Sequence, residues 1–288
     1  MTTSEDPSTG APPGTPAGPR PTGRVRLVAS DLDGTLLGPG GLVSPRTLAM
    51  ISACRAAGVH VVFVTGRPVV WVDPVVEQTG HTGTAICANG AVVYDAGQRQ
   101  VLSATGLAPA DVVEAVERLR RRLDGLAVAL ETLAGFRREP GYAVRYDGGR
   151  ESEVGELAEL LAPDPVVLKL LVRREVGTSE ELLAVAREEL AGLAHPTHSS
   201  PDSPLIEVSA VGVSKAAALA AHAAALGVAR EDVVAFGDMP NDVEMLGWAG
   251  RGYAMTGGHP EAVAAAAATA PACADDGVAR VVEGLLAG

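Results

Sequence analysis

The sequence predicts an α/β protein, with a doubly wound parallel sheet (Rossmann-like) in its core domain and an inserted α+β domain. Three apolar runs, residues 25–29, 59–64 and 233–236, lack the polar–apolar alternation of a half-exposed strand. Such Val-rich runs are typical of parallel strands that helices cover on both faces. Between residues 95 and 203 the pattern changes to short strands that alternate with helices, which indicates the inserted domain.

Composition limits the class of protein and its partners. The chain has 288 residues, 47% of them hydrophobic, enough for one large domain or two smaller ones. Its net charge of −12 disfavours nucleic acid as a partner. No apolar stretch reaches the length of a membrane span. The three widely spaced cysteines, Cys54, Cys87 and Cys273, favour reduced thiols and a cytoplasmic location.

The domain boundaries follow from these changes in pattern. Residues 1–23, rich in Pro, Gly, Thr and Ser, are predicted to be a disordered tail. The core domain is predicted to comprise residues 24–94 and 204–288, and the inserted domain residues 95–203. Both a monomer and a homodimer are compatible with the sequence.

Caps, apolar runs and glycine stops predict the individual elements. Ser44 and Pro45 begin a helix that ends near Ala57, because serine is a good N-cap and proline a good first helical residue. Further strands of the core domain are expected at residues 84–87, 91–94, 205–208 and 252–255. Further helices of the core domain are expected to begin near residues 214, 242, 260 and 276. In the inserted domain we expect helices over 109–123, 152–161 and 178–190, and strands over 126–131, 143–146 and 166–172.

The first predicted strand ends in a pair of carboxylates. Asp31 and Asp33 follow residues 25–29, and Gly34 gives the backbone the freedom to turn there. Two acids brought together at the end of a strand repel each other unless a cation lies there. This arrangement suits phosphoryl transfer, with one carboxylate to attack, one to carry a proton and a metal ion between them. A plain Asp-Gly turn is the alternative.

The second and third strands end in groups that can bind phosphate or substrate. Right-handed crossovers bring the ends of parallel strands to one edge of the sheet, where ligands bind. Thr65 and Gly66 therefore come close to Asp31, and a hydroxyl and a backbone N–H there can hold phosphate oxygens. Asn89, at the end of the third strand, is a candidate substrate contact. A strand-to-helix cap at Thr65 and a turn at Asn89 are the alternatives.

A lysine begins the helix near residue 214. Lys215 lies in its first turn, a poor place for a cation unless an anion faces it. Lys169 and Lys215 are the only lysines of the chain, while arginine is plentiful. Retention of lysine indicates a need for a compact point charge, although a surface lysine is the alternative.

A second acidic group follows the strand 233–236. Asp238 leaves this strand, and Asp242 lies four residues further on at the start of a helix. Four carboxylates at one sheet edge would repel each other strongly without a cation. Asp31, a backbone carbonyl, Asp238 and water would make a sensible Mg²⁺ site, because Mg²⁺ prefers oxygen ligands.

The other polar residues give weaker signals. Glu131, Arg145 and Asp147 could line a substrate cavity or belong to the ordinary surface. His195 and His198 lack a ligand pattern and are predicted to lie on the surface. A structural or capping role is expected for His259, which precedes a proline.

The motifs together resemble those of the haloacid dehalogenase-like (HAD) superfamily of phosphohydrolases. They are Asp-x-Asp-Gly-Thr from Asp31, Thr-Gly-Arg from Thr65, the helical Lys215, and Gly-Asp-x-x-Asn-Asp from Gly237, in that order. The layout is similar to that of the Cof-type branch, whose cap domain lies between the second and third motifs. One departure is Thr256-Gly257-Gly258, where this branch often has Gly-Asn.

The resemblance implies roles for the motif residues. Asp31 would be the nucleophile that forms an aspartyl-phosphate, and Asp33 would protonate the leaving oxygen and then activate water. Lys215 would neutralise charge on the nucleophile and the phosphate. The implied phosphate and substrate contacts are Gly34, Thr65, Gly66, Arg67, Asn89, Lys215 and Asn241. The implied Mg²⁺ ligands are Asp31, the Asp33 carbonyl, Asp238 and Asp242.

The resemblance makes a Mg²⁺-dependent phosphatase of small metabolites the first hypothesis, with sugar phosphates as the expected substrates. A phosphotransferase such as a phosphosugar mutase is one alternative. An enzyme similar to sucrose- or mannosylglycerate-phosphatases is another. A regulator that accepts phosphate on Asp31 without being an enzyme is a third, although it would need neither Asp33 nor so large an insertion.

Overall fold

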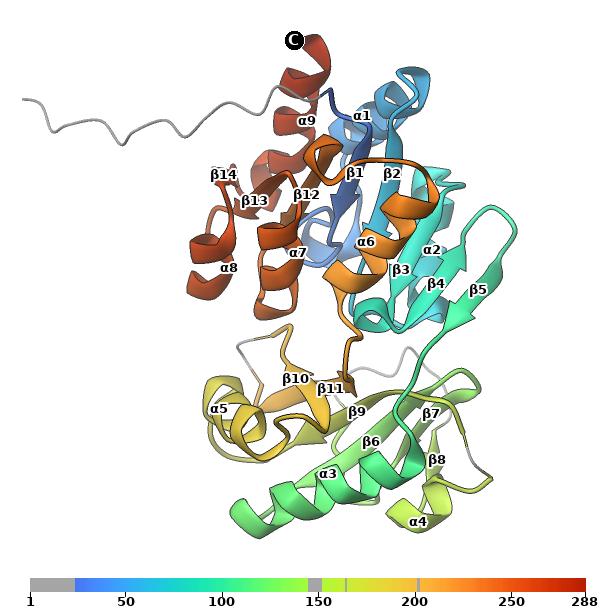
Figure 1. Ribbon diagram of the computed structural model, residues 1–288, viewed down its shortest axis with the longest axis vertical. Helices are drawn as coiled ribbons and strands as arrows, with labels where there is room; N and C mark the ends of the chain where they lie inside the picture. Colours follow the sequence, from blue (N-terminus) through green and yellow to red (C-terminus); the bar gives the residue numbers. More distant parts are fainter. Residues whose placement is uncertain (1–23, 145–151, 164, 201–202) are drawn as a thin grey trace, which may run out of the picture.

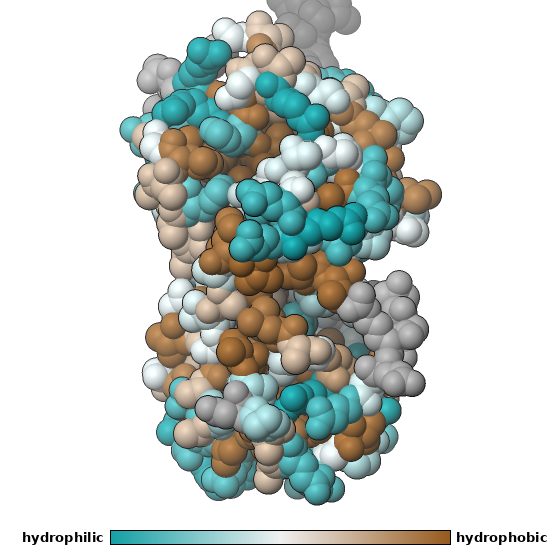
Figure 2. Space-filling model, turned by 90° about the vertical axis from the view of Figure 1, so that its right-hand side faces the viewer, coloured by the Kyte–Doolittle hydropathy of each residue, from teal (hydrophilic) through white to brown (hydrophobic). Residues whose placement is uncertain are grey.

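The computed structural model describes residues 24–144, 152–163, 165–200 and 203–288. The predicted tail 1–23 lies outside the described residues. The described chain forms two parts, each with its own sheet, that lie one above the other in Figure 1. On the face shown in Figure 2, apolar side chains gather where the two parts meet.

The larger sheet confirms the predicted parallel core. Its strand order is β14-β13-β12-β1-β2-β3-β4-β5, and all neighbours from β14 to β3 are parallel. Strand β1 lies in the middle and is buried along its whole length, because helices cover both faces. The strands are β1 (Leu27–Ser30), β2 (His60–Val64), β3 (Thr84–Cys87), β4 (Val92–Asp95), β5 (Gln100–Ala104), β12 (Val233–Gly237), β13 (Arg251–Met255) and β14 (Ala268–Ala270).

Alternate residues of β1 pack into two separate layers. Val28 belongs to the cluster of buried residues formed with α1 (Pro45–Ala56), α2 (Val69–Thr79) and α9 (Gly277–Ala287). Leu27 and Ala29 belong to the cluster on the other face. That face is covered by α6 (Lys215–Ala225), α7 (Val243–Trp248) and α8 (Pro260–Ala265). This sandwich fixes β1 and β12 side by side, and the chain continues from both strands into acidic residues at one edge.

The smaller sheet belongs to the inserted domain. Its strand order is β10-β11-β9-β6-β7-β8, and its neighbours are antiparallel except β7 and β8. Helices α3 (Pro109–Arg122) and α5 (Ser179–Glu189) pack on one face through a cluster of buried Val and Leu side chains. The other elements are α4 (Leu157–Leu160), β6 (Ala127–Thr132), β7 (Gly135–Arg138), β8 (Glu153–Val154), β9 (Val167–Arg173), β10 (Ala194–Thr197) and β11 (Leu205–Ala210).

Several predicted elements and boundaries are wrong. Strand β5 extends the larger sheet and β11 belongs to the smaller one, so the inserted segment begins after Ala104 and ends after Ala210. Residues predicted as the helix 152–161 instead form β8 and the short α4. Residues 143 and 144 are not in a strand, and the rest of the predicted strand 143–146 lies outside the described residues.

Capping residues confirm the predicted helix starts. The Ser44 hydroxyl accepts a hydrogen bond from the Thr47 N–H at 3.0 Å and begins α1. The Ser214 hydroxyl likewise accepts from the Ala217 N–H and begins α6 with Lys215. Within the described residues, none of the helices combines the length and the apolar composition needed to cross a bilayer.

The turn after β3 packs against the start of α6 through a glycine. Gly90 has φ +100°, and a Cβ there would lie 2.2 Å from the Ser214 carbonyl oxygen. Gly227 also has a positive φ, +64°, but a Cβ there would meet nothing within 4 Å. A side chain at Gly227 would therefore cause backbone strain alone, whereas a side chain at Gly90 would cause backbone strain and a steric clash.

We predict that Gly90→Ala is markedly more destabilising than Gly227→Ala. Each substitution should cost about 1 kcal/mol for the left-handed backbone, and the clash at Gly90 should add about 1–3 kcal/mol. Urea unfolding of the two variants measures the difference. Equal losses of stability would contradict the close packing of this turn on α6.

Candidate functional site

The site lies where β1 and β12 end side by side. Asp31 follows β1, and its backbone N–H donates to the Phe236 carbonyl of β12 at 2.9 Å. Only 5% of Asp31 is exposed. Asp238 follows β12, and the short helix Pro240–Asp242 comes directly after it. The fold therefore brings acids that are about two hundred residues apart in sequence to one sheet edge, as the strand ends predicted.

Lys215 lies between two buried carboxylates. Its Nζ is 2.5 Å from Asp31 Oδ1 and 2.7 Å from Asp242 Oδ1, and its side chain is fully buried. The prediction that Lys215 faces an anion is therefore confirmed. Burial alone would lower the pKa of Lys215, but Asp242 and Asp31 together raise it above its usual value. The ammonium group stays charged although it is removed from water.

Three carboxylates converge around this lysine. Asp31, Asp238 and Asp242 each offer an oxygen within 4.8 Å of the others. Burial raises the pKa of Asp31, and the neighbouring Asp242 and Asp238 raise it further against the opposing effect of Lys215. Burial and Asp242 raise the pKa of Asp238 to about 6. One cation for three acids leaves negative charge at the site, which suits a divalent cation with a preference for oxygen.

Asp242 orients the turn that carries Asp238. Its Oδ2 accepts hydrogen bonds from the backbone N–H groups of Asp238 at 3.0 Å and Met239 at 3.1 Å. A Cβ at Gly237 would lie 2.4 Å from Asp242 Cγ, so only glycine allows this close approach. One oxygen of Asp242 therefore binds Lys215, and the other holds the backbone of the turn at Asp238 and Met239.

Gly34 leaves room for the Asp238 carboxylate. Gly34 has φ +80°, and a Cβ there would lie 2.4 Å from Asp238 Oδ2. The neighbouring Thr35 hydroxyl donates to Asp238 Oδ1 at 3.0 Å. The turn after β1 thus positions an acid from β12, which is how a metal-binding carboxylate would be held in place.

Asp33 is placed differently from the prediction. Its carboxylate is not part of the group formed by Asp31, Asp238 and Asp242. Its side chain is 60% exposed and pairs with Arg67, whose Nη2 and Nε lie 2.5 Å and 2.7 Å from the two oxygens. The carboxylates of Asp31 and Asp33 therefore do not face the same point, and the expectation that they lie together is wrong. The turn at Gly34 directs the second acid outward, over the mouth of the site.

The ends of β2 and β3 bring the predicted phosphate contacts to this edge. Thr65 is buried, and its hydroxyl accepts from the Arg67 N–H at 3.0 Å. Asn89 is buried with φ +56°, a backbone conformation that asparagine tolerates better than most residues. Its Oδ1 accepts from Asn241 Nδ2 at 3.0 Å. A Cβ at Gly66 would lie 3.1 Å from Asn89 Oδ1. The segments that follow β2, β3 and β12, which carry Gly66, Asn89 and Asn241, are therefore in close contact.

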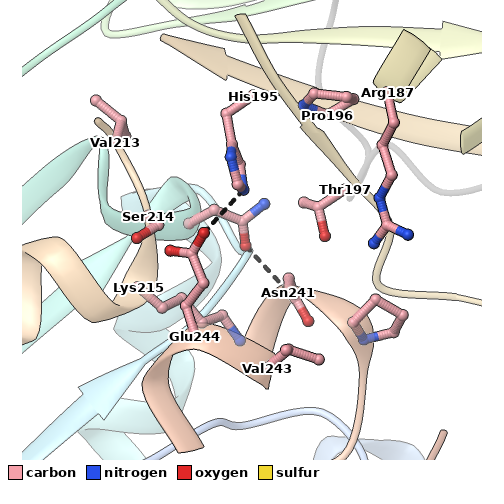
Figure 3. Close-up of a pocket in the computed structure, with 12 residues that line it drawn as sticks. Arg187, His195, Pro196, Thr197, Val213, Ser214, Lys215, Asn241, Val243 and Glu244 are labelled. Carbon is pink, nitrogen blue, oxygen red and sulfur yellow. Dashed lines mark hydrogen bonds and ion pairs between the residues drawn. The ribbon is translucent and has the colours of Figure 1, made fainter. Parts of the chain in front are cut away.

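A pocket of about 280 Å³ opens beside Lys215, between the two domains (Figure 3). Lys215 and Asn241 line it from the core domain, and Arg187, His195 and Thr197 line it from the inserted domain. His195 Nε2 lies 3.8 Å from Glu244 Oε1 across the gap. The pocket is large enough for a small metabolite and has polar groups on both walls.

The inserted domain supplies site residues that sequence reasoning missed or misplaced. Lys169 Nζ donates to the Gly66 carbonyl oxygen at 2.6 Å and lies 3.1 Å from Glu207 Oε2. Glu207 Oε2 also accepts from Asn89 Nδ2 at 2.6 Å. A glutamate inside the apolar run of β11 was the available signal for Glu207, since charged residues are seldom buried without a partner. Rarity of lysine was the signal for Lys169.

Glu131 and His198 are buried, so the surface alternative for Glu131 and the surface prediction for His198 are both wrong. Glu131 Oε2 lies 3.2 Å from Lys169 Nζ. His198 Nε2 lies 2.6 Å from Glu180 Oε1, and His259 Nε2 lies 2.8 Å from the same oxygen. Packing of two domains over these residues, which the local sequence does not encode, explains both errors. Arg145 and Asp147 lie outside the described residues.

His198 and His259 both bond to Glu180 of the inserted domain, and the bond from His259 crosses between the domains. His259 Nδ1 accepts from the Glu261 N–H, which confirms its predicted capping role. A neutral His259 therefore carries its proton on Nε2 and donates it to Glu180. Metal ligation through Nε2 would move that proton to Nδ1 and break the cap, so these contacts favour a hydrogen-bonded clasp over a metal centre. Arg187 and Glu261, 3.1 Å apart, add an ion pair to this side.

Comparison with known proteins identifies the family. The model of the haloacid dehalogenase-like hydrolases matches residues 28–282. The chain belongs to this family of hydrolases. Among curated relatives, pyridoxal phosphate phosphatase YbhA of Escherichia coli is 29% identical over 247 residues, covering 80% of this chain and 88% of the relative. HMP-PP phosphatase of Serratia proteamaculans is 32% identical over 258 residues, covering 82% and 85%.

Solved structures of this family share the whole fold. A phosphatase of the superfamily from Bacteroides thetaiotaomicron superposes with a TM-score of 0.76 at 22% identity, covering 93% of this chain and 97% of that one. A subclass IIB sugar phosphatase of the superfamily superposes with a TM-score of 0.77 at 19% identity, covering 91% and 100%. The predicted resemblance and fold class are thus confirmed, and the chain is a phosphatase-type hydrolase with an inserted domain.

We predict that Lys215→Met destabilises the metal-free protein by about 3 kcal/mol near neutral pH, because it leaves buried carboxylates without their cation. Loss of the cation raises the pKa of these acids in the folded state above the unfolded value. The folded state then binds protons that the unfolded chain releases, so the penalty should grow as the pH rises. Chemical unfolding in the presence of a chelator at several pH values measures it.

The double variant Asp31→Asn, Lys215→Met restores part of the charge balance and serves as the control. It should be more stable than Lys215→Met alone. A single variant as stable as the wild type at every pH would show that the lysine does not balance the buried acids.

Proposed function

We propose that the protein is a Mg²⁺-dependent phosphatase that hydrolyses small phosphomonoesters through an aspartyl-phosphate on Asp31. The observation that carries this proposal is the buried Lys215 between Asp31 and Asp242, with Asp238 beside them. An acid held against a charged lysine at a sheet edge is a nucleophile whose negative charge is balanced. The transferred phosphoryl group is itself negative, so fixed positive charge there stabilises the transition state.

The first half of the reaction uses Asp31 and Asp33. An Asp31 oxygen attacks phosphorus, forming an acyl-phosphate bond while the bond from phosphorus to the leaving oxygen breaks. Asp33, exposed at the mouth of the site, protonates the leaving oxygen and releases an alcohol. Both oxygens of Asp33 contact Arg67 in the structure, so this ion pair has to open before Asp33 can carry the proton to the leaving oxygen.

The second half releases phosphate. Asp33, now ionised, accepts a proton from water, whose oxygen attacks phosphorus and breaks the bond to Asp31. Inorganic phosphate leaves and both aspartates return to their starting states. Thr65 and the Gly66 amide bind the phosphoryl oxygens, and Asn241 contacts them from the other side. Lys215 holds Asp31 in place in both halves.

The carboxylate cluster fits Mg²⁺. Asp31 and Asp238 would hold the ion, with the Asp33 carbonyl and Asp242, directly or through water, completing the shell. The bound ion would supply positive charge to the phosphoryl oxygens. The space that Gly34 leaves for the Asp238 carboxylate supports this assignment, because any larger residue would displace that oxygen.

The substrate is a small phosphorylated metabolite. The pocket beside Lys215, which Asp31 itself does not line, has a volume of about 280 Å³ and suits one ring or a short chain. Relatives are named for the dephosphorylation of pyridoxal phosphate and of 5-amino-6-(5-phospho-D-ribitylamino)uracil. These names support nitrogen heterocycles as candidates beside the sugar phosphates expected from sequence. A cytoplasmic location and a monomeric or homodimeric state stay predictions.

We predict that the protein hydrolyses 4-nitrophenyl phosphate with Mg²⁺ and that Asp31→Asn lowers kcat by about 10³-fold or more, because the nucleophile is lost. Release of nitrophenolate measures the rate. Asp124→Asn, an exposed acid of the inserted domain, is the matched control and should retain full activity. Turnover by Asp31→Asn at the wild-type rate would eliminate the proposed nucleophile.

Asp33→Asn should lose about 10²–10⁴-fold in turnover while remaining folded, because general acid–base catalysis contributes on that order. With a good leaving group, the variant should accumulate phosphate on Asp31. Mass spectrometry after acid quenching detects the adduct, and circular dichroism checks the fold. An unfolded variant would assign Asp33 a structural role instead.

Mg²⁺ affinity should fall as the pH drops below about 6. The pKa of Asp238 is raised to about 6 in the metal-free protein, so below that pH the carboxylate is mostly protonated and must lose its proton to bind the ion. Each pH unit below should weaken binding about tenfold. Calorimetric titration between about pH 7.5 and about pH 5 tests this, and affinity that is independent of pH would exclude Asp238 as a ligand.

A further inference from the structure

One face of the smaller sheet is turned toward the core domain, and we call it the polar face for the charged side chains that lie there beside a small apolar cluster of Ala129, Tyr142 and Leu171. Leu130 and Leu170 point to the apolar face that α3 and α5 cover. Their neighbours Glu131 and Lys169 are cross-strand partners on the opposite face. Lys169 reaches the Gly66 carbonyl of the core domain from that face. The polar face therefore lies against the loop proposed to bind phosphate.

Two other strands continue this face. On β11, Glu207 bonds to Asn89 of the core domain, and Ser209 points to the same side two residues later. Ser209 is the cross-strand partner of His195 on β10, which lines the pocket. We call Glu131, Lys169 and Ser209 the polar row. It runs across three neighbouring strands, β6, β9 and β11.

Two atoms of the polar row are buried without a hydrogen-bond partner in the part of the chain that the structure describes. They are Glu131 Oε1 and Ser209 Oγ. Only 9% of the Glu131 side chain and 1% of Ser209 are exposed. Leaving such groups unpaired costs free energy, so native proteins usually pair them. The residues that carry these two atoms are the cross-strand neighbours of Lys169 on either side.

Lys169, which lies between them, has no donor left to pair with either atom. Lys169 Nζ already contacts the Gly66 carbonyl, Glu131 Oε2 and Glu207 Oε2. Glu207 accepts from Ser199 and Asn89 as well as from Lys169. An ammonium group has three donors, and all three are used.

The polar row and Glu207 also carry one unbalanced negative charge when both glutamates are ionised. Lys169 and the hydrogen bonds to Glu207 keep the pKa of Glu207 low although burial opposes this. Burial raises the pKa of Glu131, and Lys169 only partly offsets it. Glu131 is therefore the less well compensated of the two acids, and a positively charged hydrogen-bond donor would stabilise its ionised form.

We propose that the polar row binds the leaving group of the substrate, and that Glu131 Oε1 accepts a hydrogen bond from a cationic N–H group on it. This inference rests on the proposed phosphatase function and narrows its substrates to phosphomonoesters of nitrogen-containing alcohols. Ser209 Oγ binds a second polar atom of the same group. Lys169 fixes Glu131 and the Gly66 loop together, so that the leaving group and the phosphoryl group are held at a set separation.

Three benzyl phosphates of nearly equal size test the proposal. They carry an aminomethyl, a hydroxymethyl or an ethyl group on the ring, which provide a cationic donor, a neutral donor and no donor. The wild type should prefer the aminomethyl compound over the ethyl compound by about tenfold or more in kcat/KM, as a charge-assisted hydrogen bond implies. Glu131→Gln should reduce this preference between the aminomethyl and ethyl compounds to within about twofold.

Glu117→Gln, on the exposed surface of α3, is the matched control and should keep the wild-type preference. Thermal unfolding shows whether Glu131→Gln is folded, and Ser209→Ala provides a second, milder variant of the row. Equal rates of the wild type on all three compounds would overturn the inference while leaving the phosphatase function intact. A preference of the wild type for the hydroxymethyl compound would indicate a neutral, sugar-like leaving group and would also overturn the inference. Turnover of none of them, nor of 4-nitrophenyl phosphate, would count against the phosphatase function itself.

Discussion

The ion pairs of Lys215 with Asp31 and Asp242 are the interaction on which the site depends. Three carboxylates at one sheet edge are tolerated because a fully buried ammonium group contacts two of them. In the function that we propose, the same charge also faces the phosphoryl group. The residual negative charge explains why the cluster suits a divalent cation. The ion pairs of Lys215 therefore account both for the stability of the buried acids and for the affinity that we expect for a cation at this edge of the sheet.

The inserted domain is joined to the core domain by polar contacts on two sides. Lys169 and Glu207 reach the strand ends that carry Gly66 and Asn89. On the other side, α5 contacts α8 through the Glu180–His259 and Arg187–Glu261 pairs. Because each contact crosses the boundary between domains, the position of the inserted domain and the positions of the Gly66 and Asn89 loops are physically linked.

Much of the fold and the core of the site could be predicted from sequence, because strand ends of a parallel sheet meet at one edge. This rule placed Asp31, Thr65 and Asp238 together without knowledge of any contact. It failed for the Asp33 carboxylate, whose direction depends on the turn at Gly34 and on Arg67. The assignment of β11 to the core domain was also wrong, because an apolar run does not reveal which of two sheets it joins. Burial of Glu131 and His198 depends on packing between domains, which no local pattern encodes.

A crystal structure of the protein with Mg²⁺ and beryllium fluoride, a mimic of a phosphoryl group, would show whether Asp31 is the nucleophile. We expect a fluoroberyllate attached to an Asp31 oxygen, a metal ion between Asp31 and Asp238, and Lys215 still in contact with Asp31. A metal ion bound elsewhere, or a fluoroberyllate attached to any residue other than Asp31, would contradict this expectation.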